Sequence, residues 1–325
     1  MKTSCSFPQI SGNMHQGNQT AISEFILLGL SNQAEQQNLL FVLFLCMYLV
    51  TVIGNGLTVL AISVDPSLHT PMYLFLANLS YADISSISNS VPKMLINIQT
   101  KSQSISYVSC ITQMYFSIVF VVIDNFLLGA MAYDRLLAIC HPLSYMTIMQ
   151  PRLCILLTVI PWVLSNLIAL THTLLLVPLL FCDSNTLPHF FCDLAPLLKL
   201  SCSDTTINKL VLFVVGSSVI TFPFALILFS YVCIIRAVLR ISSTEGKRKA
   251  FSTCGSHLTV VLLFYGTIVG VYFFPSSTHP EDTDKIGAVL FAVVTPMLNP
   301  FIYTLRSKDM KGALRKLINR KSSSL

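Results

Sequence analysis

The chain has 325 residues, of which 54% are hydrophobic and 10% are charged, and its mean hydropathy is +0.71. These values exclude an ordinary soluble domain, in which the apolar share is smaller and the charged share is larger. The formal net charge of +6 is a signal of membrane topology, and it indicates no nucleic-acid partner.

Seven apolar runs follow one another along the chain, each long enough for the roughly 20 helical residues that cross a hydrocarbon core. The predicted spans are 39–64, 72–98, 110–139, 153–177, 210–235, 251–274 and 286–305. Prolines inside the spans are compatible with kinked helices in a bundle. The sequence therefore predicts an all-α membrane protein, with a seven-transmembrane helix bundle at 39–305 between an extracellular tail at 1–38 and a cytoplasmic tail at 306–325.

The sides of the membrane follow from the basic residues, which concentrate in cytoplasmic segments. The C-terminal tail, and the connections on its side, carry most of the arginines and lysines, including Arg236, Arg240 and Lys308. The C-terminus is therefore expected in the cytoplasm and the N-terminus outside the cell. On the outer tail, Asn18 begins the glycosylation sequon Asn18-Gln19-Thr20.

The cytoplasmic tail has an amphipathic pattern with helical spacing. Its apolar members are Met310, Ala313, Leu314, Leu317 and Ile318, and its basic members are Lys311, Arg315, Lys316 and Arg320. This pattern predicts a short helix that lies on the inner leaflet of the lipid bilayer.

Four cysteines fall on the predicted outer side: Cys110, Cys182, Cys192 and Cys202. In an oxidising compartment they could form two disulfides with three possible connectivities, which spacing alone does not resolve. No Cys or His spacing typical of a zinc site is present.

Polar side chains inside the spans usually face the bundle interior and mark function. Asp83 and Asp124 both lie about 16 Å from the cytoplasmic ends of their spans, at 1.5 Å per residue. Asn55 and Asn299, on the first and seventh spans, lie about 14 Å and about 10 Å deep. These four oxygen-bearing side chains could hold a hard cation such as sodium, or they could form a water-filled network that only fixes helix packing.

An adjacent acid and base, Asp134 and Arg135, close the third span within the run MAYDRLLAICHPL at 131–143. One interpretation is that the pair merely ends the helix at the membrane surface, where arginine reaches water. The other is a functional role on the cytoplasmic face.

Six sequence blocks carry a resemblance to a known family. They are Gly54-Asn55, LHTPMYLFLANLSYAD at 68–83, MAYDRLLAICHPL at 131–143, Ser230-Tyr231, KAFSTCGSHLTVV at 249–261 and PMLNPFIYTLRSKDMKGAL at 296–314. Together, over nearly the whole chain, they resemble the signature blocks of vertebrate olfactory receptors, which are rhodopsin-like G-protein-coupled receptors.

The resemblance implies an odorant receptor of the plasma membrane that is not an enzyme and has no cofactor. Its partners would be a small, mostly apolar volatile odorant and a stimulatory, olfactory-type heterotrimeric G protein, through which it raises cyclic AMP. It further implies disulfides between Cys110 and Cys192 and between Cys182 and Cys202.

The resemblance also gives Asp134, Arg135, Tyr231 and Tyr303 the role of an activation switch. Arg135 would be paired with Asp134 in the inactive state and would swing toward the two tyrosines in the active state, opening a cleft for the C-terminal helix of a G-protein α subunit. Leu136 departs from the family pattern, because tyrosine is usual there, and it removes a hydrogen-bonding group that faces the G protein.

The ligand is expected between the outer halves of the third, fifth and sixth spans, in a mostly apolar pocket. The inward positions that the resemblance suggests are Met114, Ser117, Ile118, Val121, Val122, Val215, Val219, Tyr265, Ile268, Val269 and Tyr272. Ser117 and the two tyrosines are the groups able to orient a polar handle.

Other classes are weighed on the same residues. A transporter or channel could use the buried pair Asp83 and Asp124 as part of an ion path, but it predicts internal repeats, and the sequence has none. A retinal pigment needs a lysine in the span 286–305, and an amine receptor needs an acid where Ser117 stands. For an intramembrane enzyme, His257 has no metal-ligand partner in the sequence, so it is expected to be a packing or G-protein-contact residue.

Overall fold

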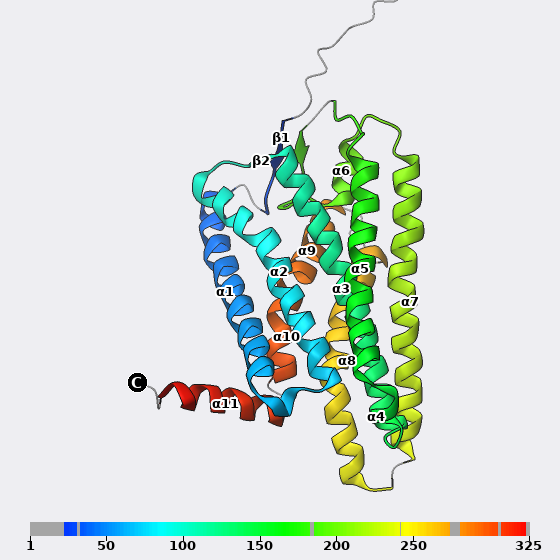
Figure 1. Ribbon diagram of the computed structural model, residues 1–325. Coiled ribbons are helices and arrows are strands. Elements are labelled where there is room, and N and C mark those ends of the chain that lie inside the picture. Colours follow the sequence, from blue (N-terminus) through cyan, green and yellow to red (C-terminus); the bar gives the residue numbers. More distant parts are fainter. Residues whose placement is uncertain are drawn as a thin grey trace, which may run out of the picture.

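The computed structural model describes residues 23–30, 33–182, 185–240, 242–273, 280–304 and 307–322. Within them, long helices run side by side between two ends of the molecule (Figure 1). These helices are α1 (Ala34–Val64), α2 (Pro71–Thr100), α3 (Tyr107–Cys140), α5 (Pro151–Leu176), α7 (Thr206–Leu239), α8 (Thr244–Phe273) and the continuous run of α9 (Pro280–Val289), η2 (Leu290–Val294) and α10 (Thr295–Thr304). The predicted seven-helix bundle is confirmed, and each helix covers most or all of one predicted span.

Five of the described helices are long and apolar enough to cross a membrane by length and composition alone. In α8 only the shorter stretch Cys254–Gly270 is strongly apolar, because basic residues such as Lys247 and Arg248 lie in its first turns. The mean hydropathy of α2 is lowered by its serines and by polar residues such as Asp83 and Asn89. Both helices reach the seven-helix arrangement through packing rather than through uniform hydropathy.

One end of the bundle, called here the sheet end, carries a small sheet that the hydropathy pattern did not predict. In it β1 (Glu24–Leu27) pairs antiparallel with β2 (Ser104–Ser106) and parallel with β3 (Thr186–Leu187). The short helix α6 (Leu194–Leu200) follows nearby in the chain. Phe25 and Leu27 of β1 are buried in one cluster with Cys110 and Cys192, so the N-terminal segment is part of the folded end of the bundle.

The opposite end, called here the α11 end, carries η1 (Pro66–Leu68), α4 (Tyr145–Ile148) and the tail helix α11 (Lys308–Ser322). Figure 1 shows α11 lying across the end of the bundle rather than along it. Met310 and Ala313 are buried, whereas Lys311, Arg315 and Lys316 are exposed. The predicted amphipathic helix is therefore confirmed, although the side chains of Ile318 and Arg320 lie outside the described residues.

Close helix contacts are made where glycine faces proline. A Cβ atom added at Gly54 of α1 would lie 2.9 Å from Cγ of Pro300 in α10, and one at Gly129 of α3 would lie 3.3 Å from Cβ of Pro223 in α7. Larger side chains at either glycine would push the helices apart.

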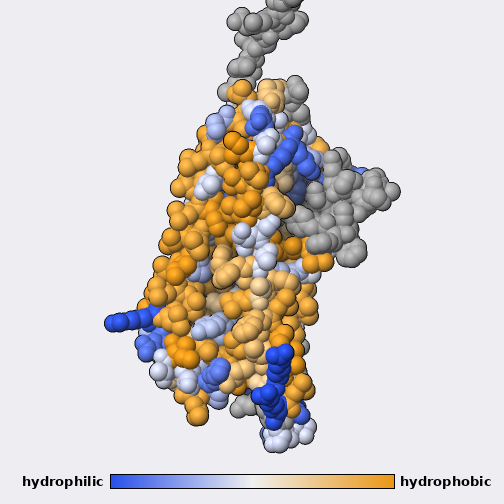
Figure 2. All heavy atoms as spheres, turned by 90° about the vertical axis from the view of Figure 1, so that its right-hand side faces the viewer, coloured by the Kyte–Doolittle hydropathy of each residue, from blue (hydrophilic) through white to orange (hydrophobic). Residues whose placement is uncertain are grey.

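The flank of the bundle is apolar. Figure 2 shows hydrophobic residues covering most of one side between its two ends. On α7, Phe213, Phe222 and Phe229 are between 62% and 72% exposed, which is the arrangement expected for a surface in contact with lipid rather than with water.

Candidate functional site

The acid and base in the last two turns of α3, Asp134 and Arg135, are both buried, and they contact different helices. Tyr145 of α4 donates its hydroxyl to Oδ1 of Asp134 at 2.7 Å, and Arg135 reaches Sδ of Met72 at the start of α2. Neighbouring positions on a helix do not face each other. Among the described contacts Asp134 and Arg135 are therefore bound to other partners and not to one another, and Nε of Arg135 has no hydrogen-bond partner there.

A histidine joins three helices two turns deeper in the bundle. His257 of α8 is fully buried, with Nε2 3.0 Å from the Leu128 carbonyl oxygen of α3 and Nδ1 2.8 Å from the Tyr231 hydroxyl of α7. A carbonyl oxygen only accepts, so Nε2 carries the proton, and a neutral ring then accepts from Tyr231 at Nδ1. His257 is thus a packing residue, since complete burial leaves it no surface for a G-protein contact.

Tyr303 of α10 completes the set of predicted switch residues. It is buried and is close enough to Arg135 and Tyr231 to interact with them electrostatically. Its hydroxyl has no hydrogen-bond partner among the described residues. A buried hydroxyl without a partner is costly, so a rearrangement that supplied one would be favoured.

The predicted polar cluster is buried as a whole, and two of its contacts cross between helices. Asn299 Nδ2 donates to Oδ2 of Asp83 at 2.8 Å, and Asn55 Nδ2 donates to the carbonyl oxygen of Pro296 at 3.0 Å. Three oxygens remain without partners in the described residues, namely Oδ1 of Asn55, of Asp124 and of Asn299. All three are acceptors, a set that suits either a hard cation or ordered water.

Most of the predicted ligand positions are partly or fully buried, but not all of them equally. Met114, Val122, Val219 and Tyr265 are buried, and Ser117, Ile118, Val215 and Ile268 are half-buried. By contrast, Val121 and Val269 are 36% and 44% exposed. The side chain of Tyr272 lies outside the described residues.

A residue that the sequence analysis missed connects this region. Asn125 of α3 is buried, donates through Nδ2 to the carbonyl oxygen of Val219 in α7, and accepts at Oδ1 from the hydroxyl of Tyr265 in α8. The signal available in the sequence was a second polar residue directly after Asp124 inside an apolar run. Asn125 therefore links the three helices that were expected to surround the ligand.

Ser117 belongs to a second network that was also missed. Asn89 of α2 donates to Oγ of Ser117 at 3.0 Å and to the Gln113 carbonyl oxygen at 2.9 Å. Gln113 returns a bond to the Asn89 carbonyl oxygen at 2.7 Å and accepts at Oε1 from the Cys192 backbone N–H at 2.8 Å. The hydroxyl oxygen of Ser117, which was expected to orient the ligand, therefore already accepts a hydrogen bond from Asn89. Through Gln113 the same network reaches the Cys192 backbone at the sheet end.

Two disulfides join the described cysteines of the sheet end. Cys110 is bonded to Cys192 and Cys182 to Cys202, which is the pairing that the resemblance implies. The first attaches the segment after β3 to α3, and the second closes the loop that leads into α7.

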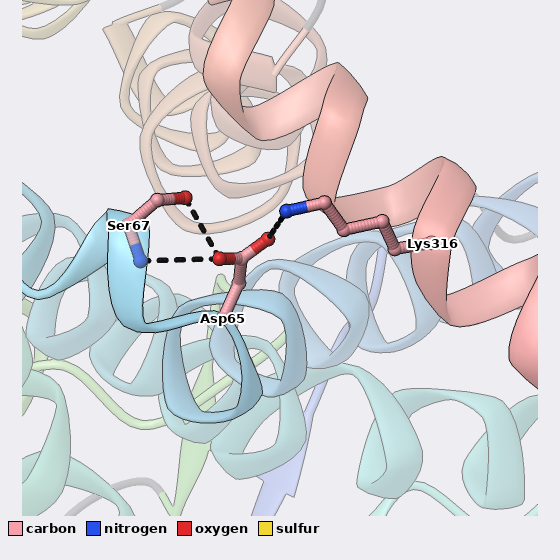
Figure 3. Close-up of polar contacts among 3 residues, drawn as sticks. All are labelled: Asp65, Ser67 and Lys316. Atoms are coloured by element: carbon pink, nitrogen blue, oxygen red, sulfur yellow. Dashed lines mark hydrogen bonds and ion pairs between the residues drawn. The ribbon is translucent and has the colours of Figure 1, made fainter.

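At the α11 end the tail helix is attached to the turn between α1 and α2. Lys316 Nζ lies 2.8 Å from Oδ2 of Asp65, whose Oδ1 accepts from the backbone N–H and the hydroxyl of Ser67 at 3.1 and 2.7 Å. Figure 3 shows these three residues and the contacts between them. The bond from Lys316, followed by those from Ser67, lowers the pKa of Asp65 to about 2. A second contact joins the hydroxyls of Tyr73 and Ser307 at 2.8 Å.

Comparison with known proteins places the chain in one family. An olfactory receptor family profile matches residues 44–321. Olfactory receptor 1S1 of Homo sapiens is 82% identical over 325 residues, which is all of both chains, and olfactory receptor 1S2 of Homo sapiens is 81% identical over the same length. Olfactory receptor 1M1 of Mus musculus is 58% identical over 311 residues, 96% of this chain and 99% of its own.

These likenesses decide between the classes that the sequence left open. They favour a receptor over a transporter or channel built on Asp83 and Asp124, and over an enzyme. The chain therefore belongs to the olfactory receptor family, whose members are multi-pass membrane receptors for odorants that act with G proteins.

Proposed function

We propose that the chain binds a small, mostly apolar volatile between α3, α7 and α8, and that it activates a stimulatory G protein at the α11 end to raise cyclic AMP. In this proposal residues 1–38 are an extracellular tail, 39–305 the transmembrane domain and 306–325 a cytoplasmic tail. Asn18, which lies outside the described residues, would then be on the glycosylated side.

The observation that carries the proposal is the Asn125 link between the expected pocket and three helices. Tyr265 is both a predicted ligand position and the donor to Asn125. An occupant that competes for this hydroxyl changes the contact between α8 and α3. Because α8 also carries His257, the same displacement acts on the bonds to Leu128 and Tyr231.

The mechanism that follows is a shift between two arrangements of the α11 end. When α8 moves, the hydroxyl of Tyr231 is released from His257, and Arg135 can exchange Met72 for the two tyrosine hydroxyls, including the unpaired one of Tyr303. The vacated space is the cleft for the G-protein α subunit. Because Leu136 lacks the hydroxyl of the tyrosine that is usual at this position, we expect the receptor to bind the G protein more weakly than a receptor with that tyrosine.

The orientation rests on charge. Basic residues of the α11 end, such as Arg152, Arg240 and Arg315, are exposed beside the bundle, and such residues mark the cytoplasmic side of a membrane protein. The two disulfides at the opposite end suit the oxidising exterior.

We propose further that the polar cluster holds sodium in the inactive receptor, with Asp83 as its charged ligand and the oxygens of Asp124, Asn55 and Asn299 nearby. The unpaired acceptors support this. Replacing extracellular sodium with choline should change the odorant response of the wild type, and Asp83→Ala should remove that sodium dependence. A wild-type response that is insensitive to sodium would contradict the cation and leave a water-filled network.

The function is tested by expressing the receptor in cells and screening a chemically diverse odorant panel with a cyclic AMP readout. At least one apolar volatile should raise cyclic AMP, Arg135→Ala should abolish the rise at equal surface display, and Tyr265→Phe should shift the concentration dependence. Arg152→Ala, which removes a basic residue exposed near the same end, is the matched control and should respond normally. Silence of displayed receptor across the whole panel would contradict the proposal.

A further inference from the structure

A second cavity, of about 230 Å³, lies at the sheet end. It is partly open, and it is lined by the end of β1 and the residues that follow it, the first turns of α1, the last turns of α2, and Gln103 and Phe190. At about 30 Å³ for each water molecule, this volume equals about eight waters, the size of a small organic molecule. None of its lining residues belongs to the expected odorant pocket between α3, α7 and α8.

The walls of the cavity are largely apolar and well packed. Leu27 of β1, Met94 of α2 and Phe190 after β3 all line it and are 2%, 4% and 1% exposed. Leu40 of α1 contributes from the facing side. An apolar body placed against these residues leaves water, and the polar side chains that also line the cavity are those of Gln37, Asn97, Lys101 and Gln103.

Asn97 of α2 and Lys101, which directly follows α2, lie at this cavity one helical turn apart. Oδ1 of Asn97 is buried and has no hydrogen-bond partner in the described part of the chain. Lys101 also lines the cavity and forms no ion pair with any described residue. The first group can only accept a hydrogen bond and the second can only donate, so a ligand group that suits both must donate and accept at once. A hydroxyl does so.

The backbone at Lys101 supplies an independent observation. Lys101 follows the last residue of α2 in the left-handed conformation, with φ 55° and ψ 22°, and it is the one non-glycine residue with positive φ in the described segments. Glycine takes this position at helix ends without strain. Strained residues of this kind cluster at ligand-binding sites, and here the strained residue is an exposed lysine that lines the cavity.

We propose that this cavity is a second binding site, which takes a small apolar molecule bearing a hydroxyl group. The hydroxyl donates to Asn97 and accepts from Lys101, and the hydrocarbon part lies against Met94 and Phe190. Since the site bridges β1, α1 and α2, its occupant ties the N-terminal segment to the bundle.

The test uses the full-length receptor in lipid nanodiscs and an eight-carbon alkyl alcohol that carries a photoreactive diazirine, with labelled peptides mapped by mass spectrometry. Labelling is expected within residues 27–40 and 94–103. The methyl ether of the same probe cannot donate to Asn97 and should label these segments about tenfold less, the loss typical of a buried polar group left unpaired.

Lys101→Gly is the decisive variant, because it removes the ammonium group while relieving the backbone, so that a failure to fold cannot explain its result. It should lower labelling of the two segments about tenfold, as expected for a lost hydrogen bond to a charged group. Lys93→Gln, which changes another lysine of α2 that does not line the cavity, should label normally. Labelling found only elsewhere, equal labelling by the ether, or unchanged labelling of Lys101→Gly would each overturn the proposal.

This experiment is separable from the test of the receptor function. Arg135→Ala should lose the cyclic AMP response and keep full labelling of the second site. If that variant lost its labelling as well, the cavity would depend on the activation state and would not be the independent site proposed.

Discussion

The two ends of the bundle are held by different kinds of interaction. The sheet end has two disulfides and a three-stranded sheet, with further backbone bonds such as that from Ile26 N–H to the Asn185 carbonyl oxygen at 2.7 Å. At the α11 end the helices and the tail are joined mainly through single side chains, among them His257, Tyr145 and Lys316.

This difference indicates which end of the bundle can rearrange its contacts when a ligand binds. Covalent bonds and ladder hydrogen bonds cannot be exchanged for others at similar free energy, whereas each side-chain hydrogen bond contributes about 0.5–1.5 kcal/mol net. A few such bonds can be traded for a different set by a ligand of modest differential affinity. The end expected to receive the odorant is therefore preformed, and the end expected to signal is poised between two arrangements.

The largest effect is expected from the covalent tie at the sheet end. Cys110→Ser removes the bond to Cys192, a loss that typically costs about 2–5 kcal/mol of stability, and should abolish surface display measured by antibody binding on intact cells. Cys46→Ser removes an exposed free thiol and should be displayed normally. Normal display of both Cys110→Ser and Cys192→Ser would show that the sheet end is not held in this way.

The next largest effect is expected at His257. His257→Phe removes the bonds of His257 to the Leu128 carbonyl oxygen and to the Tyr231 hydroxyl, each worth about 0.5–1.5 kcal/mol net, and it leaves the Tyr231 hydroxyl with its longer bond to the Cys254 carbonyl oxygen at 3.3 Å. Ligand-independent cyclic AMP should rise about fivefold or more as Tyr231 becomes available to Arg135. His172→Phe is the control, since this histidine of α5 is also buried but makes no hydrogen bond among the residues described. Equal basal activity in both variants would contradict the proposal that the bonds of His257 restrain the inactive state.

A smaller rise is expected from Tyr145→Phe, which removes one hydrogen bond to a carboxylate. Bonds to charged groups contribute about 1.5–3 kcal/mol when well formed, and this one is half-exposed at Tyr145, so basal cyclic AMP should rise about two- to threefold. Tyr133→Phe removes a hydroxyl without a hydrogen-bond partner in the described structure and serves as the matched variant. A basal signal no higher than that of Tyr133→Phe would mean that Tyr145 does not restrain α3.

The smallest effect is expected at the exposed tail contact. Asp65→Asn removes the ion pair with Lys316 and should speed amide hydrogen exchange in α11 about twofold, with unchanged cyclic AMP. Asp204→Asn, at an exposed carboxylate whose pKa is lowered by hydrogen bonds from Thr206, changes a comparable group at the sheet end and should leave exchange in α11 unaltered.

The same contact makes a pH prediction. The pKa of Asp65 is lowered to about 2, so its contribution is fully present above the ordinary carboxyl pKa of about 4 and is lost only as the pH falls through about 2. Between pH 5 and 8, exchange in α11 corrected for the intrinsic rate should not change. A transition within that range would assign the contact to another group.

The apolar runs and the amphipathic tail pattern predicted the seven long helices and the tail helix, because bilayer thickness fixes the length of each span and one side of α11 repeats with helical period. They did not predict the short helices η1, α4 and α6. It missed β1, β2 and β3, whose two to four residues are too short for a periodic signal. It also missed the π-helical turn η2, which depends on how α10 packs against its neighbours.

The candidate site was predicted unevenly for a similar reason. Asp83 and Asp124 are conspicuous as charges in apolar runs, and helical rise placed them with Asn55 and Asn299. Asn125 and Gln113 are neutral, and their importance lies in which backbone groups they meet across the bundle. Such pairings depend on helix rotation, which composition and spacing do not determine.

The central claim is that odorant binding changes the α11 end and leaves the sheet end in place. It is tested most directly by electron paramagnetic resonance distances between spin labels on genetically encoded unnatural amino acids, in receptor with and without an odorant found active in the panel. One pair at Arg152 and Arg248 reports on α5 and α8 at the α11 end, and one at Leu174 and Ile207 reports on α5 and α7 at the sheet end. The account predicts a longer distance for the first pair on odorant binding and no change for the second. A shift confined to the sheet end, or none at either, would contradict it.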